Sequence, residues 1–348
     1  MPDRVPVGPF GLGRLDPESL LAQELIERAD PLICVGSGGS PFLGKNIHVE
    51  GLDIGDERQH TYHFPGVALT RRTRRNPITS ACVDFPFKNY ADVEMYLNAP
   101  FELPDPDPKE YRRWCERVGE QALVLVGIPN AVCLPADWFS PERFCMAWAE
   151  RSDLVTELVR VAGERVNAYA EKLCKAGVRA FRIVGGEYAS VQLGPGAFRR
   201  LCVPFDRELI RTMHRHGALA YYHNHGKVRR YLDDFIQIGM DALDPLEAPP
   251  WGDIDDLGAA RRALGGRIGV VGNLDDMEVL ESLELDEIEN IARQRLWQAG
   301  PGGFVLGGTA SGTYRERGAR AFLAMCDVVD KEMPRLRELH ESGKSHGE

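Results

Sequence analysis

Two histidines and several carboxylates stand where short apolar runs of the sequence end. In Tyr221-Tyr222-His223-Asn224-His225-Gly226, two imidazoles close an apolar run at a spacing of two residues. Residues two apart in a strand point to the same side, so both rings would face one point and could share a metal ion. Glu247 follows the next apolar run and completes a set of two histidines and one carboxylate, which suits Zn²⁺ and also Fe²⁺. We therefore predict a metal site formed by His223, His225 and Glu247, with two ordinary packed histidines as the alternative.

A second pair with the same spacing provides a contrast. His214 and His216 end a predicted helix, where residues two apart diverge around the axis. We expect no shared ligand there, because the local structure rather than the spacing decides whether the rings converge.

Three further polar residues follow apolar runs and are predicted to be catalytic. Glu187 comes after a pair of glycines that lets the backbone approach a ligand, and Tyr188 supplies a phenol beside it. Glu187 would act as general base, substrate anchor or metal ligand, or would cap the next loop. Asn273 would donate an amide hydrogen bond to the substrate, or stabilise its own loop.

Two more residues are candidates for contacting the substrate. Thr309 follows Gly307-Gly308 at the end of the last apolar run. Asp253 follows Pro249-Pro250-Trp251-Gly252 and would either contact the substrate or cap a helix or turn.

The elements that must position these residues alternate in a regular way. Short apolar runs occupy residues 4–10, 31–35, 122–126, 180–184, 218–222, 242–246, 268–271 and 303–306. Amphipathic stretches with apolar spacings of three and four, such as 153–174, 196–216, 227–238 and 286–298, predict the covering helices. Eight parallel strands close into a filled barrel, so we predict a (β/α)8 fold, with an open doubly wound sheet as the alternative.

The predicted barrel is interrupted near its N-terminal end. Residues 61–70 are typical of a hairpin with a Pro65-Gly66 turn, and a Pro- and Asp-rich stretch follows. We expect one barrel over residues 1–336 with 45–110 as a capping insertion, and a charged tail over 337–348. Asp16-Pro17-Glu18 predicts a helix start with an N-cap Asp. The basic run from Arg71 to Arg75 would attract an anionic substrate over the barrel mouth, or would simply be solvated.

Composition narrows the class of protein. The 348 residues are 43% hydrophobic and 27% charged, as in an ordinary globular protein with a sizeable core. A net charge of −10 argues against a general binder of nucleic acids or membrane surfaces, which needs cationic groups. Eight cysteines without any CxxC pair are expected to be free thiols. The absence of a signal-peptide pattern and of a long apolar stretch favours a cytoplasmic location.

Several of these motifs occur in a familiar order. They are Gly186-Glu187-Tyr188-Ala189-Ser190, Pro204-Phe205, His216-Gly217, His223-x-His225-Gly226, Gly239-x-Asp241-Ala242-Leu243, Gly252-Asp253 and Gly272-Asn273-Leu274. The ordered set resembles the uroporphyrinogen decarboxylase superfamily over about residues 60 to 335. The resemblance implies a (β/α)8 barrel. The superfamily includes zinc-dependent methyltransferases that pass methyl groups between corrinoid proteins and thiol or other acceptors.

The metal ligands of the methyltransferase branch match only in part. That branch has His-x-Cys-Gly after the fifth strand, an acidic residue after the sixth and a second Cys after the eighth. His223 and Glu247 match, whereas His225 stands in place of the first Cys and Ala310 lies near the place of the second. Loss of both thiolates argues against activation of a thiol acceptor, and the imidazoles and carboxylate leave a harder metal site.

The decarboxylase branch matches less well. Its Arg-Gln-x-Gly-Arg motif, which grips porphyrin carboxylates, is reduced here to Phe10-Gly11-Leu12-Gly13-Arg14. A highly carboxylated substrate needs several cationic clamps, and Arg14 alone preserves one.

These observations lead to one preferred function and two alternatives. We expect a methyltransferase or O-demethylase that moves a methyl group between a small substrate and a corrinoid on a partner protein. Metal held by His223, His225 and Glu247 would polarise the substrate oxygen, with Glu187 as base or anchor. A metal-independent decarboxylase or lyase that uses Arg14 and Tyr188 is the first alternative, and a non-catalytic ligand-binding barrel is the second. Assembly into a homodimer stays open.

Overall fold

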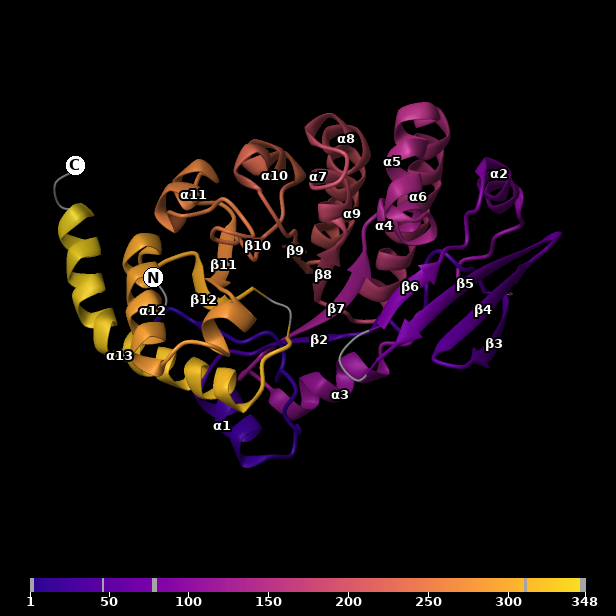
Figure 1. The fold of residues 1–348 in the computed structure, drawn as a ribbon. Helices are drawn as coiled ribbons and strands as arrows, with labels where there is room; N and C mark the ends of the chain where they lie inside the picture. The colour runs from indigo at the N-terminus through magenta and orange to yellow at the C-terminus, as the bar shows by residue number, and fades with distance from the viewer. Residues whose placement is uncertain (1–2, 46, 77–79, 310–311, 345–348) are drawn as a thin grey trace.

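A sheet of eight parallel strands forms the centre of the computed structural model, which describes residues 3–45, 47–76, 80–309 and 312–344 (Figure 1). The strands are β1 (Val7–Gly8), β2 (Leu32–Val35), β7 (Leu123–Pro129), β8 (Ala180–Val184), β9 (Leu219–His223), β10 (Ala242–Asp244), β11 (Gly269–Leu274) and β12 (Phe304–Gly308). Each lies within or overlaps one of the eight predicted apolar runs. Their order is β1-β12-β11-β10-β9-β8-β7-β2.

The sheet closes on itself between its two end strands. Phe10, just after β1, forms a parallel bridge with Leu32 at the start of β2. The backbone N–H of Gly11 donates to the Leu32 carbonyl at 2.8 Å, and the N–H of Leu32 donates to the Pro9 carbonyl at 2.9 Å. These bonds join the first and last strands, so the (β/α)8 prediction is confirmed and the open doubly wound sheet is wrong.

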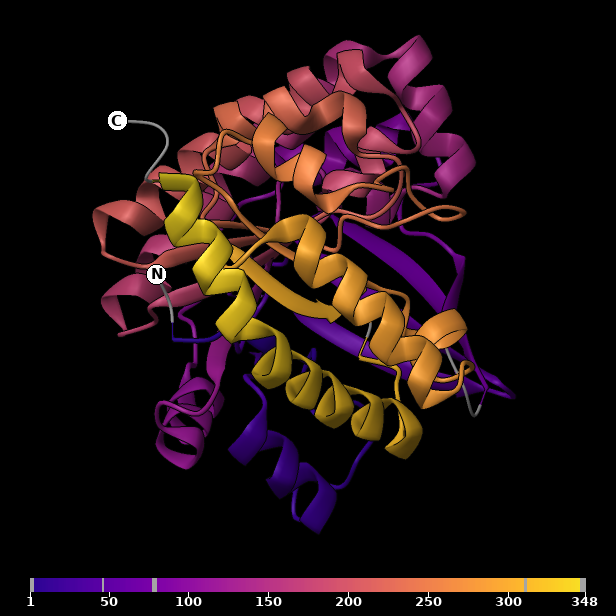
Figure 2. The ribbon, with the colours of Figure 1, turned by 90° about the vertical axis from the view of Figure 1, so that its left-hand side faces the viewer.

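Helices cover the outside of the barrel (Figure 1). They are α1 (Leu20–Arg28), α2 (Tyr90–Asn98), α3 (Lys109–Val118), α4 (Cys133–Trp138), α5 (Pro141–Glu150), α6 (Ser152–Lys175), α7 (Gly186–Ser190), α8 (Pro195–Leu201), α9 (Val203–Arg215), η1 (Arg229–Tyr231), α10 (Leu232–Ile238), α11 (Leu257–Ala263), η2 (Asp276–Leu280), α12 (Leu285–Ala299) and α13 (Glu316–Lys344). In Figure 2 the long helix α13 runs across the outside of the barrel next to α12 and α1. A buried Leu or Val contributes roughly 1.5–3 kcal/mol, so the apolar stripes of these helices hold them against the strands.

A second sheet of four antiparallel strands lies between β2 and β7 in the chain. Its strands are β3 (His48–Ile54), β4 (Glu57–Phe64), β5 (Val67–Arg75) and β6 (Ser80–Asp84), and Figure 1 shows them projecting to one side of the barrel. The predicted hairpin is confirmed, since Phe64 pairs with Val67 across Pro65-Gly66. Tyr62 of β4 stacks on Trp138 of α4 with ring centroids 5.4 Å apart. Since α4 follows β7, this contact holds the sheet beside the end of the barrel where β7 finishes.

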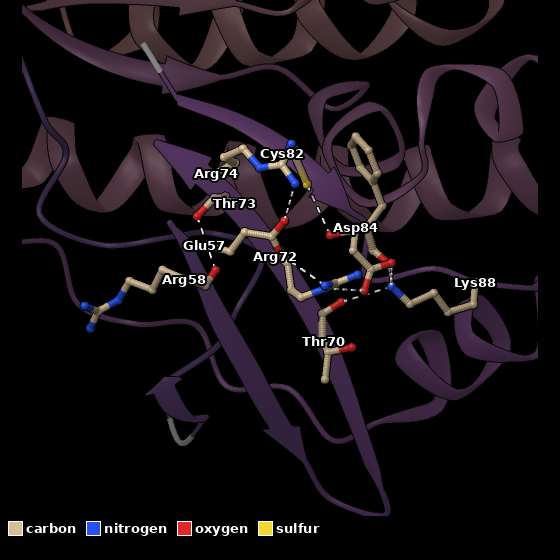
Figure 3. Close-up of polar contacts among 10 residues, drawn as sticks. Glu57, Arg58, Thr70, Arg72, Thr73, Arg74, Cys82, Asp84 and Lys88 are labelled. Atoms are coloured by element: carbon tan, nitrogen blue, oxygen red, sulfur yellow. Dashed lines mark hydrogen bonds and ion pairs between the residues drawn. The ribbon is translucent and has the colours of Figure 1, made fainter. Parts of the chain in front are cut away.

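The basic run on β5 is paired within this sheet. Glu57 accepts hydrogen bonds from Arg72 at 3.0 Å and from Arg74 at 2.7 Å (Figure 3). Arg72 also lies 3.6 Å from Asp84, and Arg74 lies 3.2 Å from Asp56. The positive charges of these two arginines are therefore paired with carboxylates of the same sheet and its turn.

Some predicted helix boundaries are wrong. Helix α1 begins at Leu20 and its N-cap is Ser19, whose hydroxyl accepts from the N–H of Ala22 at 3.3 Å. Asp16 accepts from the N–H of Glu18 at 2.9 Å, so it closes a turn before the helix instead of capping it. The stretch 196–216 contains two helices, α8 and α9, which meet at Cys202. The expected tail over 337–348 is helical up to Lys344, and its last residues lie outside the described part.

The cysteines are unpaired, as the sequence predicted. All eight cysteines are free thiols. Within the described ranges, no helix has both the length and the hydropathy that crossing a lipid bilayer requires.

Candidate active site at the carboxyl ends of the strands

The two histidines at the end of β9 are each held by a different carboxylate. His223 ends β9 opposite Asp244 of β10, and its Nδ1 lies 3.0 Å from Asp244 Oδ2. His225 Nδ1 lies 2.9 Å from Glu247 Oε1. The ring centroids are 4.4 Å apart and the ring planes are nearly perpendicular at 88°. The strand therefore brings the imidazoles together as predicted from their spacing, with each ring oriented through one nitrogen.

Glu247 also binds the backbone next to His225. Its Oε2 accepts from the N–H of Gly226 at 2.6 Å. Gly226 has φ of +90°, and a Cβ at this position would lie 2.8 Å from a methyl of Val191. Only glycine fits this conformation and this space without strain, so Gly226 allows the chain to turn against the Glu247 carboxylate.

The loop that carries Glu247 is fixed by Asn273. Leu246, just before Glu247, has φ of 49°, a conformation that a bulky L-residue rarely adopts. The Asn273 side-chain amide donates to the Leu246 carbonyl at 2.8 Å and to the Ile254 carbonyl at 3.3 Å. Asn273 is 4% exposed and does not line the cavity described below. Its amide thus holds the neighbouring loop of residues 246–254, whereas the predicted roles were a substrate contact or stabilisation of its own loop.

The His225–Glu247 contact shifts both pKa values. Burial lowers the pKa of His225, but the hydrogen bond and negative charge of Glu247, with the charges of Glu187 and Asp244, outweigh it and raise that pKa. Burial raises the pKa of Glu247, but the hydrogen bonds from His225 and Gly226 outweigh this and lower it. The pair is therefore an ion pair at pH values where an ordinary histidine is already losing its proton.

These contacts define how the predicted metal ligands are used. Both oxygens of Glu247 are hydrogen-bonded to the 225–226 segment, so in this conformation Glu247 orients His225. Its role as a third metal ligand stays a prediction. The Nε2 atoms of His223 and His225 have no hydrogen-bond partner in the described residues. A histidine whose Nδ1 is held by a carboxylate is the usual arrangement of a ring that ligates metal through its other nitrogen. No group of three His, Cys, Asp or Glu side chains able to hold a metal occurs in the described residues, and Ala310 lies outside them.

A cavity of about 630 Å³ opens beside His225. Its walls come from the ends of several strands and include Glu187 and Tyr188 of α7, Glu247, and Thr309 after β12. Glu187 Oε2 is buried and has no hydrogen-bond partner in the described residues. The Tyr188 hydroxyl lies 3.4 Å from Asp137 Oδ1 of α4, and its pKa is raised by burial and by the neighbouring carboxylates. The structure thus brings His225, Glu247, Glu187, Tyr188 and Thr309 to one space.

Two predicted substrate contacts lie elsewhere. Arg14 is exposed and lines a separate cavity with Arg315 and Arg320. The Asp253 carboxylate accepts from the N–H of Arg229 at 3.0 Å, and the Asp253 carbonyl accepts from the Arg229 guanidinium at 3.1 Å. Neither Arg14 nor Asp253 lines the cavity beside His225. Asp253 has the capping role that was its alternative.

Several residues of the site were missed. Asp244 holds His223, and Asp275, Asp276 and Glu278 line the cavity together with Trp251. Asp244 and Asp275 end or directly follow strands, so the rule used for the other candidates, the polar residue at each strand end, identifies both. Trp251 and Glu278 sit in loop and π-helical segments whose direction no sequence pattern indicates.

The second His-x-His pair behaves as expected. His214 Nε2 lies 2.9 Å from Asp241, whereas His216 Nε2 lies 3.9 Å from Glu171. The two rings have different partners on different elements, which confirms that this pair is not a shared site.

Comparisons with known proteins agree with the barrel. The family model described as uroporphyrinogen decarboxylase (URO-D) matches residues 130–331. A methyltransferase from Methanosarcina mazei is similar in structure with a TM-score of 0.62 and 16% identity, over 94% of each chain. A B12-independent methionine synthase from Shewanella sp. W3-18-1 has a TM-score of 0.45 and 12% identity, over 83% of this chain and 76% of that one. No curated protein sequence matches this chain.

Proposed function

Because the chain belongs to the uroporphyrinogen decarboxylase family, whose model matches more than half of its 348 residues, we propose that it is a methyl-transferring enzyme of that family. It moves a methyl group between a small substrate in the cavity beside His225 and a corrinoid carried by a partner protein. The observation that carries the proposal is the composition of this cavity. Its wall contains an oriented imidazole and five carboxylates.

The same composition disfavours decarboxylation of a polycarboxylate. In the described residues neither lysine nor arginine lines the cavity. A substrate with several carboxylates loses its hydration there and meets five carboxylates and an imidazole that is already paired with Glu247, which is unfavourable in a partly desolvated space. Arg14, the remaining member of the carboxylate-gripping motif, lines a different cavity.

The His225–Glu247 pair supplies the proton chemistry. When a methyl group leaves an oxygen, the C–O bond breaks, its electron pair stays on the oxygen, and that oxygen needs a proton. Glu247 fixes His225 through Nδ1, so the proton that serves the leaving oxygen sits on His225 Nε2. The raised pKa of His225 keeps this proton available to higher pH than in an ordinary histidine. In the opposite direction the same nitrogen takes the proton of a hydroxyl that becomes methylated.

Zinc is the metal that the family resemblance implies. His223 and His225 would hold it through their Nε2 atoms, since Asp244 and Glu247 orient the two rings through Nδ1. Zinc there would take the place of the proton on His225 Nε2, so the metal-bound site and the proton-carrying site are two alternative states. When bound, zinc would supply a Lewis acid that lowers the pKa of a substrate oxygen.

The test is methyl exchange with free methylcobalamin and cob(I)alamin, followed by the cobalamin absorbance, with methoxylated and hydroxylated acceptors. We expect transfer by the native chain and its loss in His225→Ala. The matched control is His214→Ala, whose partner Asp241 is remote from the cavity. Equal transfer by the native protein and His225→Ala would contradict the proposed site, and release of CO₂ from a carboxylated substrate would favour the lyase instead.

A further inference from the structure

The cavity beside His225 has a strong excess of negative charge. Its carboxylates are Glu187, Glu247, Asp275, Asp276 and Glu278. The cationic group that faces them from the wall is the His225 imidazole, which is paired with Glu247. Among the described residues, no lysine or arginine of the cavity wall faces Glu187, Asp275 or Glu278.

Backbone N–H groups fix two of these carboxylates but do not neutralise them. Asp275 accepts from the N–H groups of Met277 at 2.9 Å and Glu278 at 2.7 Å, at the start of η2. Asp276 is 2% exposed and accepts from the N–H of Thr309 at 2.9 Å. These bonds hold both carboxylates in fixed positions at the cavity wall.

Glu187 and Glu278 differ from these two carboxylates. Neither Glu187 nor Glu278 forms a hydrogen bond or an ion pair through its carboxylate with any described residue. Glu187 Oε2 is also buried, and leaving a buried acceptor unsatisfied costs about 1–3 kcal/mol. A ligand that supplies positive charge would remove this cost and the repulsion among the carboxylates.

Aromatic groups complete the wall. Trp251, on the same loop as Glu247, lines the cavity although 58% of its surface is exposed, and Tyr188 lines it next to Glu187. The face of an indole ring attracts a cation by about 0.5–2 kcal/mol. Carboxylates combined with an accessible indole are suited to an ammonium group with alkyl substituents, which is large, weakly hydrated and positive.

We propose that the substrate of this cavity is an organic cation that carries an alkylated ammonium group, held by Glu187, the 275–278 carboxylates and Trp251. This inference rests on the proposed function for the reaction, while the choice of a cation depends on the cavity alone. A volume of about 630 Å³ accommodates such a group together with the part of the substrate that reaches His225.

The test compares two probes of the same shape. Choline and 3,3-dimethylbutan-1-ol differ in a positive nitrogen against a neutral carbon, and their binding to the full chain is measured by titration calorimetry. We expect choline to bind at least about tenfold more tightly, because charge and cation–π attraction act on it alone. Its affinity should fall as salt is added.

Variants locate the binding. Glu187→Gln and Trp251→Leu should each weaken choline about three- to tenfold and leave the neutral probe unchanged. Glu120→Gln, which changes an exposed carboxylate just before β7 at the opposite end of that strand, is the control and should affect neither probe.

Each outcome decides the inference. Equal binding of the two probes, or binding of choline that Glu187→Gln and Trp251→Leu leave intact, would overturn it, as would binding of Mg²⁺ or Ca²⁺ that excludes choline. A thermal melt of each variant shows whether it is folded. Methyl transfer from a neutral methoxylated substrate without choline binding would leave the proposed reaction standing and reject the cation. Choline binding without any methyl transfer would support the cation site and reject the proposed reaction.

Discussion

Two charged regions of this molecule contrast in how their charges are balanced. On the four-stranded sheet, Glu57 binds Arg72 and Arg74 (Figure 3). Arg72 also lies near Asp84, and Arg74 lies near Asp56. In the cavity beside His225, the wall residues that the structure describes include five carboxylates and one imidazole. The sheet contains the more conspicuous run of charged residues in the sequence, yet the carboxylates that pair with its arginines belong to the same sheet and its turn.

The difference separates charges that are paired within the fold from charges that are left available to a ligand. Ion pairs between exposed side chains contribute little to the free energy of unfolding, and their charges are already balanced without a ligand. Unmatched carboxylates in a partly closed space are destabilising, and they persist where function needs them. The comparison predicts that changing the sheet alters stability slightly and activity not at all, whereas changing the cavity alters activity first.

The largest expected effect concerns a carboxyl that is buried without any cation. Asp206 of α9 is 1% exposed, and its Oδ2 accepts from the Tyr222 hydroxyl at 2.5 Å and the Asn130 amide at 3.1 Å. Burial raises the pKa of Asp206 to about 7, against the opposing effect of these two bonds. The Oδ1 atoms of Asp206 and Asn130 are both buried acceptors without a donor in the described residues, and a proton on Asp206 would turn one of them into a donor.

This raised pKa gives stability a definite pH dependence. The folded chain keeps the Asp206 proton up to about pH 7, whereas the unfolded chain loses it near the ordinary value of 3.8. The contribution is complete below about pH 4 and is lost as pH rises to about 7, by on the order of 4 kcal/mol. Urea unfolding of Asp206→Asn between pH 4.5 and 7.5 should lack this decline. Parallel curves for the native and variant proteins would show that Asp206 is ionised throughout.

The next effect is on catalysis. His225→Ala should reduce methyl transfer about 100-fold, since a positioned acid or base contributes roughly 10²–10⁴-fold. The same change should leave the free energy of unfolding within about 1 kcal/mol, because His225 is 37% exposed and its pair with Glu247 is screened. A large loss of stability together with activity would indicate that the pair serves the fold.

The sheet should respond in the opposite way. Glu57→Gln removes the shared partner of Arg72 and Arg74, which keep Asp84 and Asp56, so we expect a loss of about 0.5–1 kcal/mol. Methyl transfer should be unchanged. The exposed pair of Arg58 and Asp53 on the same sheet is the control, and Arg58→Gln should have no measurable effect on chemical unfolding. Reduced methyl transfer by Glu57→Gln would indicate that the basic run from Arg71 to Arg75 takes part in substrate binding after all.

The sequence predicted the barrel because its signals are local and repeated. Each of the eight strands lies within or overlaps an apolar run of four to seven residues, and a parallel strand buried on both faces requires such a run. The predicted start of α1 was wrong because Asp16 and Ser19 are both residue types that cap helices well. The choice between them depends on the path of the chain after β1.

The site was predicted only where strand geometry fixes it. His223 and His225 converge because a strand has a period of two, and Glu187, Tyr188 and Thr309 reach the cavity because they follow strands. Arg14 and Asp253 lie outside the cavity because loops carry them, and the direction of a loop depends on tertiary contacts. The orienting role of Asp244 was missed because a carboxylate at the end of one strand gives no local signal of which ring on the neighbouring strand it will face.

The smallest effect tests how the His225 imidazole is held. Glu247→Gln keeps the shape of the side chain but removes its charge, so the pKa of His225 should fall from its raised position. Because the folded-state pKa is raised, the pair stabilises the fold fully below the pKa of an ordinary histidine, and this contribution disappears as pH rises through the raised value. Proton NMR of the His225 ring across about pH 5 to 9 measures the shift directly, with Glu120→Gln as the unaffected control. If the His225 pKa is the same in Glu247→Gln, the charges of Glu187 and Asp244 are what keep the proton on His225. Of the two contacts between a histidine and a carboxylate, the 3.0 Å contact of Asp244 with His223 would then be the one left to orient a ring.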